Sequence, residues 1–111
     1  MFGAANHLGG VVPFLWDRIA SSFRTRPEAK LYIQKPPAEY LKRLYYDTVN
    51  FNPASWRCTI DAVGIDHLVY GSDYPLPIGS MERGIAIIDA LDITPEQRET
   101  IYSGNAKRLL R

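Results

Sequence analysis

The sequence predicts an α/β fold in which parallel strands alternate with helices, and three observations support it. Short apolar or β-branched runs stand at three places along the chain, and a helix-type pattern follows each of them. The clearest run, residues 68–70, holds three apolar residues and stops at Gly71, as buried parallel strands do. Proline-rich and glycine-rich segments separate the elements. Alternation of this kind is typical of parallel strands joined by crossover helices.

Local signals give the bounds of the expected elements. Asn52 before Pro53 marks the start of a helix, and Gly64 marks its end. Ser80 can cap the helix that follows the third strand, and Thr94 to Gln97 have the pattern of a capping box. The expected elements are strands at residues 1–6, 45–49 and 68–70, and helices at residues 11–23, 38–44, 53–63, 81–91, 94–103 and 105–110.

Helical spacing also predicts which side chains face the core. Phe14 and Trp16 are expected to be buried in the first helix, and Ile85 and Ile88 in the helix after the third strand. Asn105 is expected to cap the last helix.

Composition limits the size, location and partners of the protein. Its 111 residues are 46% hydrophobic with a formal net charge of +1, which fits one globular domain and gives no electrostatic case for nucleic acid or an anionic membrane. No apolar run is long enough to span a membrane, and the first ten residues lack the features of a signal peptide. Cys58 is the only cysteine, so an internal disulfide is excluded and a reducing, cytoplasmic location is expected.

Three strands are too few for a parallel sheet that buries both faces. A barrel of eight strand–helix units needs about 250 residues. We therefore expect residues 1–111 to be the C-terminal three βα units of a (β/α)8 TIM barrel, cut at its first residues. Because its edges and faces would lack cover, we expect the chain to pair with the missing N-terminal part of the barrel or to form a homo-oligomer.

Each predicted strand ends near a side chain that can do chemistry. His7 follows the first strand, Asp47 lies on the second, and Asp73 follows the third. Because the carboxyl ends of parallel strands meet at one edge, these groups are expected to converge although they are far apart in sequence. A histidine beside a carboxylate suits a divalent metal site, with zinc or another cation, or acid–base catalysis.

Simpler interpretations stand beside these. Asp73 could only cap a turn, and His7 could be an ordinary loop residue. Asp47, inside the strand run, is expected to make structural hydrogen bonds, and His67, at the opposite end of its strand, is expected to be structural or solvated.

Two arginines near the first helix form a second candidate group. Arg18 and Arg26 are about two helical turns apart. They could form a solvated basic face, or their guanidinium groups could hold a carboxylate.

Several motifs together resemble a known family. HLGGVVPFLWDRI, the R-x-R-P connector, YYDTVNFNP, GIDHLVYGSDYPLPIG and SGNAKRLL are similar to the C-terminal part of the amidohydrolase-related decarboxylases (amidohydrolase 2). The resemblance implies a (β/α)8 barrel with one divalent metal, usually zinc. It further implies that Asp73 is a metal ligand, that His7 is the acid–base residue beside the metal, and that Arg18 and Arg26 hold a substrate carboxylate in the neighbouring subunit.

The chain departs from the family pattern in its metal ligands. The first-strand His-x-His pair and a further histidine from a middle strand are absent, and Leu76 stands where phenylalanine is common. The reaction expected from the resemblance is non-oxidative decarboxylation of a small unsaturated or aromatic carboxylic acid. A metal-dependent hydrolase or hydratase on the same barrel is the alternative, and an inactive fragment that acts only with a partner is a third possibility. We expect the isolated chain to be inactive.

Overall fold

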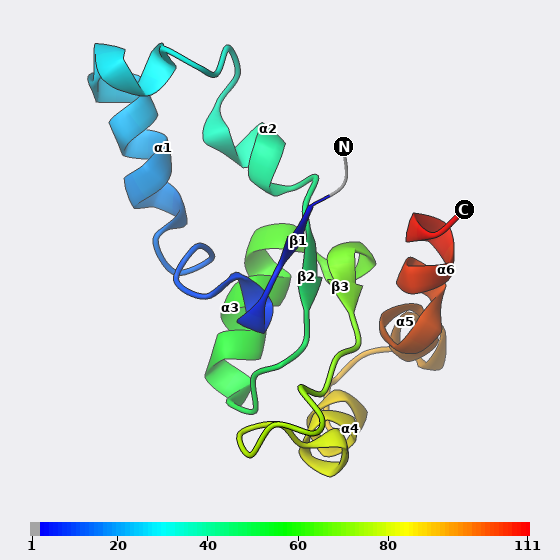
Figure 1. The fold of residues 1–111 in the computed structure, drawn as a ribbon. Coiled ribbons are helices and arrows are strands. Elements are labelled where there is room, and N and C mark those ends of the chain that lie inside the picture. Colours follow the sequence, from blue (N-terminus) through cyan, green and yellow to red (C-terminus); the bar gives the residue numbers. More distant parts are fainter. Residues whose placement is uncertain (1–2) are drawn as a thin grey trace.

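A three-stranded parallel sheet lies at the centre of the computed structural model, which describes residues 3–111 (Figure 1). Its strands are β1 (Ala4–Ala5), β2 (Tyr45–Asp47) and β3 (Leu68–Val69), in the order β1-β2-β3. The predicted parallel pairing is confirmed, although each strand is shorter than expected. Residues 1 and 2 of the first expected strand lie outside the described residues.

The helices surround this sheet unevenly. In Figure 1, α3 packs behind the sheet, α5 and α6 lie beyond β3, and α1 and α2 form an arm that stands away from the strands. Within residues 3–111, no helix is both long and apolar enough to span a membrane. The helices are α1 (Trp16–Thr25), α2 (Pro37–Leu41), α3 (Pro53–Val63), α4 (Met81–Asp89), α5 (Pro95–Glu99) and α6 (Asn105–Leu109), with short 3-10 turns at His7–Gly9, Pro27–Lys30 and Ile65–His67 and a π-helical turn at Thr100–Gly104.

The termini of α3 and α5 follow the sequence signals. The Asn52 carboxamide oxygen accepts the backbone N–H of Ala54 at 2.8 Å, which satisfies an orphan donor in the first turn of α3. Gly64 ends the helix with φ 80°, a conformation that glycine adopts at little cost. Thr94 and Gln97 form the predicted capping box at α5. The bounds predicted for α3 are confirmed residue for residue.

The core lies between the sheet and the helices behind it. One face of the sheet contributes Tyr46 and Leu68, which are neighbours in register across β2 and β3. These side chains pack with buried residues of the loop after β1, α3, α4 and the π-helical turn: Leu8, Trp56, Val63, Ile88 and Ile101.

Two of the predicted core positions are wrong. Phe14 is 81% exposed, because residues 11–15 form turns and α1 begins only at Trp16, which does pack against the core. Ile85 is 40% exposed, because α4 contacts the protein along the line of Gly84 and Ile88, and Ile85 lies to one side of that line.

Asn105 is a third correction, because its side chain does not cap a helix. The residue is helical and fully buried, and α5, the π-helical turn and α6 run on without a break. Its carboxamide N–H2 donates to the carbonyls of Ile65 at 2.8 Å and Leu68 at 2.7 Å, and its oxygen accepts from Arg108. Asn105 therefore anchors the C-terminal helix to the start of β3.

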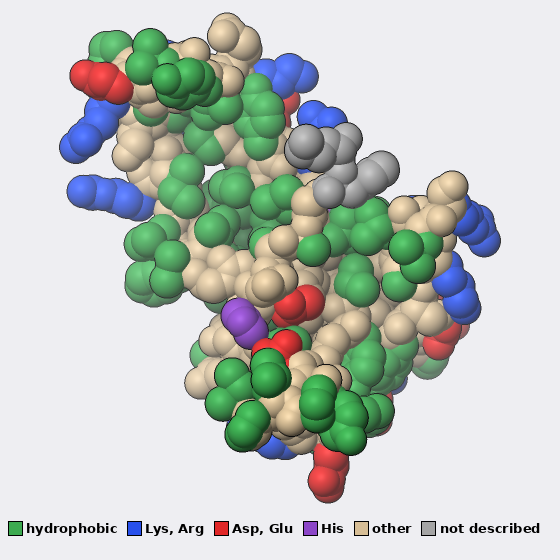
Figure 2. All heavy atoms as spheres, in the orientation of Figure 1, with side chains coloured by type: hydrophobic (Ala, Val, Ile, Leu, Met, Phe, Trp, Pro, Cys, Tyr) green, Lys and Arg blue, Asp and Glu red, His purple; other side chains and the backbone are tan. Residues whose placement is uncertain are grey.

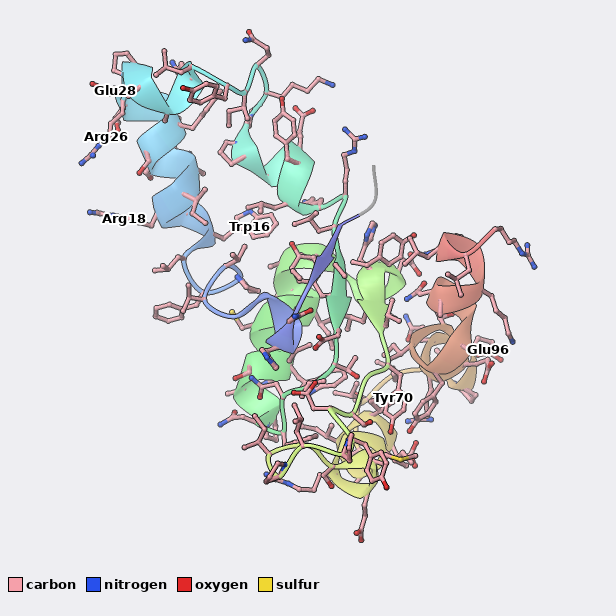
Figure 3. The ribbon with its side chains drawn as sticks, viewed as in Figure 1. Trp16, Arg18, Arg26, Glu28, Tyr70 and Glu96 are labelled. Atoms are coloured by element: carbon pink, nitrogen blue, oxygen red, sulfur yellow. The ribbon has the colours of Figure 1, made fainter. Side chains whose placement is uncertain are left out.

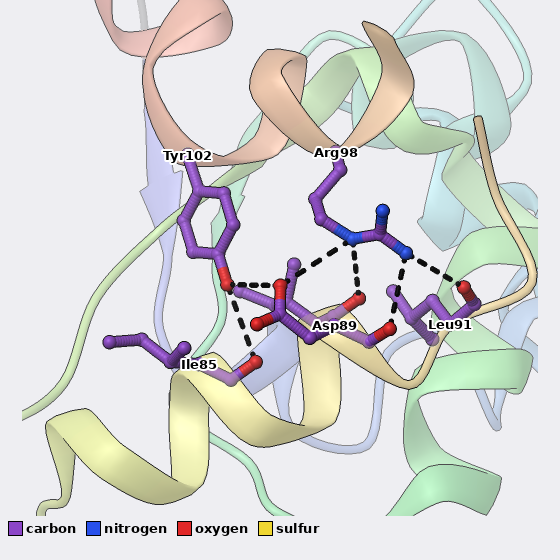
Figure 4. Close-up of polar contacts among 6 residues, drawn as sticks. Ile85, Asp89, Leu91, Arg98 and Tyr102 are labelled. Atoms are coloured by element: carbon purple, nitrogen blue, oxygen red, sulfur yellow. Dashed lines mark hydrogen bonds and ion pairs between the residues drawn. The ribbon is translucent and has the colours of Figure 1, made fainter. Parts of the chain in front are cut away.

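A polar cluster joins α4 to the C-terminal helices (Figure 4). Arg98 donates to the carbonyls of Asp89 at 3.1 Å and Leu91 at 3.2 Å, at the C-terminal end of α4. The Tyr102 hydroxyl donates to the Asp89 carboxylate at 3.0 Å. Burial, followed by this hydrogen bond and the charge of Asp89, raises the pKa of Tyr102 from 10.0 to about 12.

This shift predicts a loss of stability in alkaline solution. Between pH 10 and about pH 12 the unfolded chain loses the Tyr102 proton while the folded chain keeps it, so the free energy of unfolding falls as pH rises through this range. Tyr102→Phe should make the fall shallower in urea unfolding measured at stepped pH. Some fall should remain, because burial also raises the pKa of Tyr46. An unchanged pH slope in Tyr102→Phe would contradict the assignment.

Candidate functional site

The carboxyl edge of the sheet brings together the three predicted side chains. His7 Nδ1 lies 3.9 Å from Asp73 Oδ2, although 66 positions separate them in sequence. Asp47 Oδ1 accepts the backbone N–H of His7 at 2.8 Å. The expected convergence of His7, Asp47 and Asp73 is confirmed, and it follows from the parallel order of the strands.

His7 is presented by a tight left-handed turn. His7 and Leu8 both have φ 56°, and Gly9 and Gly10 continue with positive φ. Leu8 is buried in the core, whereas the His7 side chain is 53% exposed. The buried leucine anchors the turn, so the imidazole stands at the edge of the sheet where a solute can reach it.

Asp73 lies in a compact loop between β3 and α4. The Ser80 N–H donates to the Ser72 carbonyl at 2.9 Å and closes the base of this loop. Gly79 packs against the backbone of Asp73 so closely that an added Cβ would lie 2.5 Å from it. Asp73 has φ 55° and a side chain that is 25% exposed, so its carboxylate is held in place but open on one side.

The end of β2 holds both of these loops. Asp47 Oδ1 also accepts the Val49 N–H at 3.0 Å, so the structural hydrogen bonds expected of this aspartate are confirmed. Thr48, which sequence reasoning missed, is fully buried, and its hydroxyl accepts the N–H of Gly71 at 2.9 Å. Only its place in a strand-like run was visible in the sequence, and that pattern does not distinguish a packing threonine from a hydrogen-bonding one.

His67 has the structural position predicted for it. Its Nδ1 lies 2.9 Å from the Leu44 carbonyl, and its ring lies 5.1 Å from the Tyr45 ring between centroids. Both contacts are at the amino end of β3, away from the His7 edge.

Arg18 and Arg26 lie on the outer side of α1. Both are exposed and share a shallow hollow of about 110 Å³ with Ser21, Ser22 and Thr25. Figure 3 shows both guanidinium groups pointing away from the sheet. The structure therefore places the two arginines together but does not bring them to His7 and Asp73 of the same chain.

The described residues offer only part of a metal site. Within residues 3–111, no group of three or more His, Cys, Asp or Glu side chains is arranged to hold a metal ion. Asp73 offers a hard carboxylate oxygen, and His7 offers a ring nitrogen beside it. This pair fits one side of a divalent-cation site, which needs further ligands.

Apolar surface surrounds this edge. Figure 2 shows a surface histidine beside acidic side chains, with hydrophobic side chains on either side. A hollow of about 220 Å³ adjoins the His7 turn, and the N-terminal half of α3 forms its other wall. It is lined by Leu8, Gly10, Pro13, Phe14, Asn50, Ala54, Ser55, Cys58 and Thr59.

Comparison with known proteins settles the family. A family model described as amidohydrolase matches residues 6–111, almost the whole chain. The chain belongs to the amidohydrolase family. This match confirms the resemblance that the His-x-Gly-Gly and Gly-Ser-Asp-Tyr-Pro motifs indicate.

Curated amidohydrolase relatives include two proteins named 2-amino-3-carboxymuconate-6-semialdehyde decarboxylase. That of Dictyostelium discoideum is 27% identical and that of Caenorhabditis elegans 29% identical, each over 94% of this chain. A 2-keto-4-carboxy-3-hexenedioate hydratase from Sphingobium is 26% identical over 93% of the chain. The chain spans only 29%, 26% and 31% of these relatives' own lengths.

A solved structure shows the same fold. The dihydroxybenzoic acid decarboxylase of Polaromonas, determined with bound manganese and the inhibitor 2-nitroresorcinol, superposes with a TM-score of 0.81 at 21% identity. The match covers 96% of this chain and 32% of that protein. The three-stranded sheet of this amidohydrolase chain is consistent with part of a TIM barrel.

Proposed function

We propose that this chain forms the C-terminal three βα units of a (β/α)8 barrel that catalyses a metal-dependent, non-oxidative decarboxylation. The substrate class is a small unsaturated or aromatic carboxylic acid. One observation carries the proposal: His7 Nδ1 and Asp73 Oδ2 lie 3.9 Å apart at the carboxyl end of a parallel sheet. The decarboxylase names of two relatives and of a structural neighbour support this choice of reaction.

In this proposal Asp73 is a ligand of a divalent cation, and His7 lies beside it. Manganese in the Polaromonas decarboxylase supports a divalent ion, and zinc is the ion that the histidine–carboxylate chemistry favours. A divalent ion held there would stabilise negative charge on the substrate and lower the pKa of a nearby water. The remaining ligands would come from other strands of the barrel or from a second chain.

His7 is the proposed proton donor and acceptor. Histidine is the commonest side chain for proton transfer, and the half-exposed imidazole of His7 can reach a bound acid. Protonation of the carbon that bears the carboxylate lets the carbon–carbon bond break. The electron pair of that bond returns to the unsaturated system as carbon dioxide leaves.

Arg18 and Arg26 are the proposed holders of a substrate carboxylate. Neighbouring guanidinium groups bind carboxylates through paired hydrogen bonds. The two arginines share one hollow on the outer side of α1 and point away from the sheet (Figure 3). This placement suits a substrate bound at the strand-end edge of a neighbouring copy, and we therefore propose a homo-oligomer.

A hydratase is the second candidate, because one relative is named as a hydratase of a small unsaturated acid. The same cation and His7 could add water to a double bond instead of releasing carbon dioxide.

The test measures carbon dioxide release and acid consumption together. The protein is purified from the cells that produce it, in the assembly that it forms there, and is incubated with Mn²⁺ or Zn²⁺ and a panel of small aromatic and unsaturated carboxylic acids. We expect one carbon dioxide per acid consumed, loss of turnover after chelation, and a drop in kcat of roughly 100-fold or more in His7→Ala. His67→Ala is the matched control and should keep its kcat.

Other outcomes of the same assay decide between the candidates. Consumption of an acid with gain of one water and no carbon dioxide would favour the hydratase. No consumption of any acid by the metal-loaded assembly would contradict both enzyme proposals. The isolated 111-residue chain should release no carbon dioxide, because residues 3–111 offer no group of three or more ligating side chains for a metal.

A further inference from the structure

Two adjacent side chains at the end of β2 hold the loops on both sides of them. Asp47 reaches toward the loop after β1, and Thr48 reaches toward the loop after β3. β2 is the middle strand, so its carboxyl end lies between the loop that carries His7 and the loop that carries Asp73. No other described strand lies next to both loops.

The Asp47 contact holds a turn that is unfavourable on its own. Asp47 Oδ1 accepts the N–H of His7 at 2.8 Å. His7 and Leu8 both have φ 56°, in the left-handed region that is especially costly for leucine. Such a turn persists only where its surroundings determine it. The charge-assisted hydrogen bond from Asp47, on the neighbouring strand, fixes the backbone of His7, the residue that bears the imidazole.

The Thr48 contact holds the other loop near its start, at Gly71. The Thr48 hydroxyl accepts the N–H of Gly71 at 2.9 Å and donates to the Gly71 carbonyl at 3.3 Å. This reciprocal pair satisfies a hydroxyl that is fully buried. Gly71 lies two residues before Asp73, whose own backbone has φ 55°. Thr48 therefore fixes the backbone of the loop after β3 at Gly71, and this helps to fix the position of the Asp73 carboxylate two residues later.

We propose that Asp47 and Thr48 are positioning residues that set the separation of His7 and Asp73. The inference rests on the proposed function for its consequence, because the pair matters to the reaction only if His7 and Asp73 are the acid–base residue and the metal ligand. Neither side chain is proposed to touch the substrate. Each acts through the backbone of the loop that it holds. Together the two loops set the distance between the His7 imidazole and the Asp73 carboxylate.

The test measures amide hydrogen exchange by NMR in the metal-free 111-residue chain. Asp47→Leu should lower the protection of the His7 amide, and Thr48→Val that of the Gly71 amide, each by about tenfold or more. Asp47→Asn and Thr48→Ser keep an acceptor oxygen in place and should restore protection. The Tyr70 amide, which bonds the Ile101 carbonyl, is the internal reference and should keep its protection.

The reference amide separates positioning from general stabilisation. If protection of Tyr70 falls as much as that of His7 or Gly71, the residues only stabilise the domain and the inference is wrong. Equal protection of His7 in Asp47→Leu and in the wild-type chain would also overturn it. Thr100→Val removes a hydroxyl that bonds the Glu96 carbonyl in the C-terminal helices, and this control should leave both site amides unchanged. If Thr48→Val fails to fold, the protection of the His7 amide in Asp47→Leu and in Asp47→Asn still tests the inference.

A second readout keeps this inference distinct from the proposed function. The same variants are titrated with Mn²⁺ alone, and the affinity is compared with that of the wild-type chain. A positioning role predicts weaker binding in Asp47→Leu and recovery in Asp47→Asn. If the variants lose amide protection locally but no form of the chain binds Mn²⁺, the positioning contacts are supported. The same result counts against the metal role of Asp73. Unaltered Mn²⁺ affinity in all variants would overturn the positioning role.

Discussion

Trp56→Ala is expected to lower the free energy of unfolding by about 3–5 kcal/mol, the usual cost of removing a large buried aromatic side chain. Trp56 is fully buried in the core, and its indole N–H donates to the Asn50 carbonyl at 2.6 Å. The loss would be a large share of the total stability of a domain this size, which is typically about 5–15 kcal/mol. Urea unfolding followed by circular dichroism measures it.

Trp56→Phe is the matched control for this prediction. It keeps much of the ring but loses the hydrogen bond, so it should cost less than the alanine variant and isolate the contribution of the N–H. A cost for Trp56→Ala no larger than that of an exposed substitution, such as Arg57→Ala, would show that Trp56 is not part of the packed core.

Gly79→Ala should disrupt the loop that holds Asp73. An added Cβ would lie 2.5 Å from the backbone carbonyl carbon and oxygen of Asp73, and backbone atoms cannot rotate out of the way. We expect a destabilisation of about 1–3 kcal/mol, as for other overpacked sites, together with large changes in the amide chemical shifts of Ser72 and Asp73. Unfolding curves and NMR spectra of the same sample measure both effects.

Gly104→Ala is the control, because an added Cβ there would lie 3.7 Å from its nearest neighbours in a helical backbone. It should leave stability unchanged or raise it slightly. An unperturbed Asp73 amide in Gly79→Ala would contradict the tight loop packing.

Much of this fold follows from local signals in the sequence. Asn52 and Gly64 give the bounds of α3, and Thr94 gives the start of α5, because capping needs only short-range hydrogen bonds. The meeting of His7 and Asp73 was also predictable, since alternating strands and helices imply parallel strands whose carboxyl ends share one edge.

The wrong predictions concern tertiary contacts that periodicity does not encode. Phe14 has a helical spacing, but after the left-handed turn at His7–Gly9 the helix α1 begins only at Trp16. The Phe14 ring is therefore exposed. Asn105 follows a glycine as a cap would, but its partners are carbonyls about 40 positions away. The role of Thr48 was missed rather than wrongly predicted, because its bond to Gly71 joins β2 to the loop after β3. The roles of Asp73, His7, Arg18 and Arg26 stay predictions.

We propose that the edge formed by His7 and Asp73 is one side of a divalent-cation site. The most direct measurement is Mn²⁺-induced broadening of NMR signals in the ¹⁵N-labelled chain, which detects even weak binding by an incomplete site. We expect broadening centred on His7 and Asp73 that disappears in Asp73→Ala and persists in Asp66→Ala, a control at the opposite end of β3. Broadening centred on another part of the chain, or unchanged in Asp73→Ala, would contradict it.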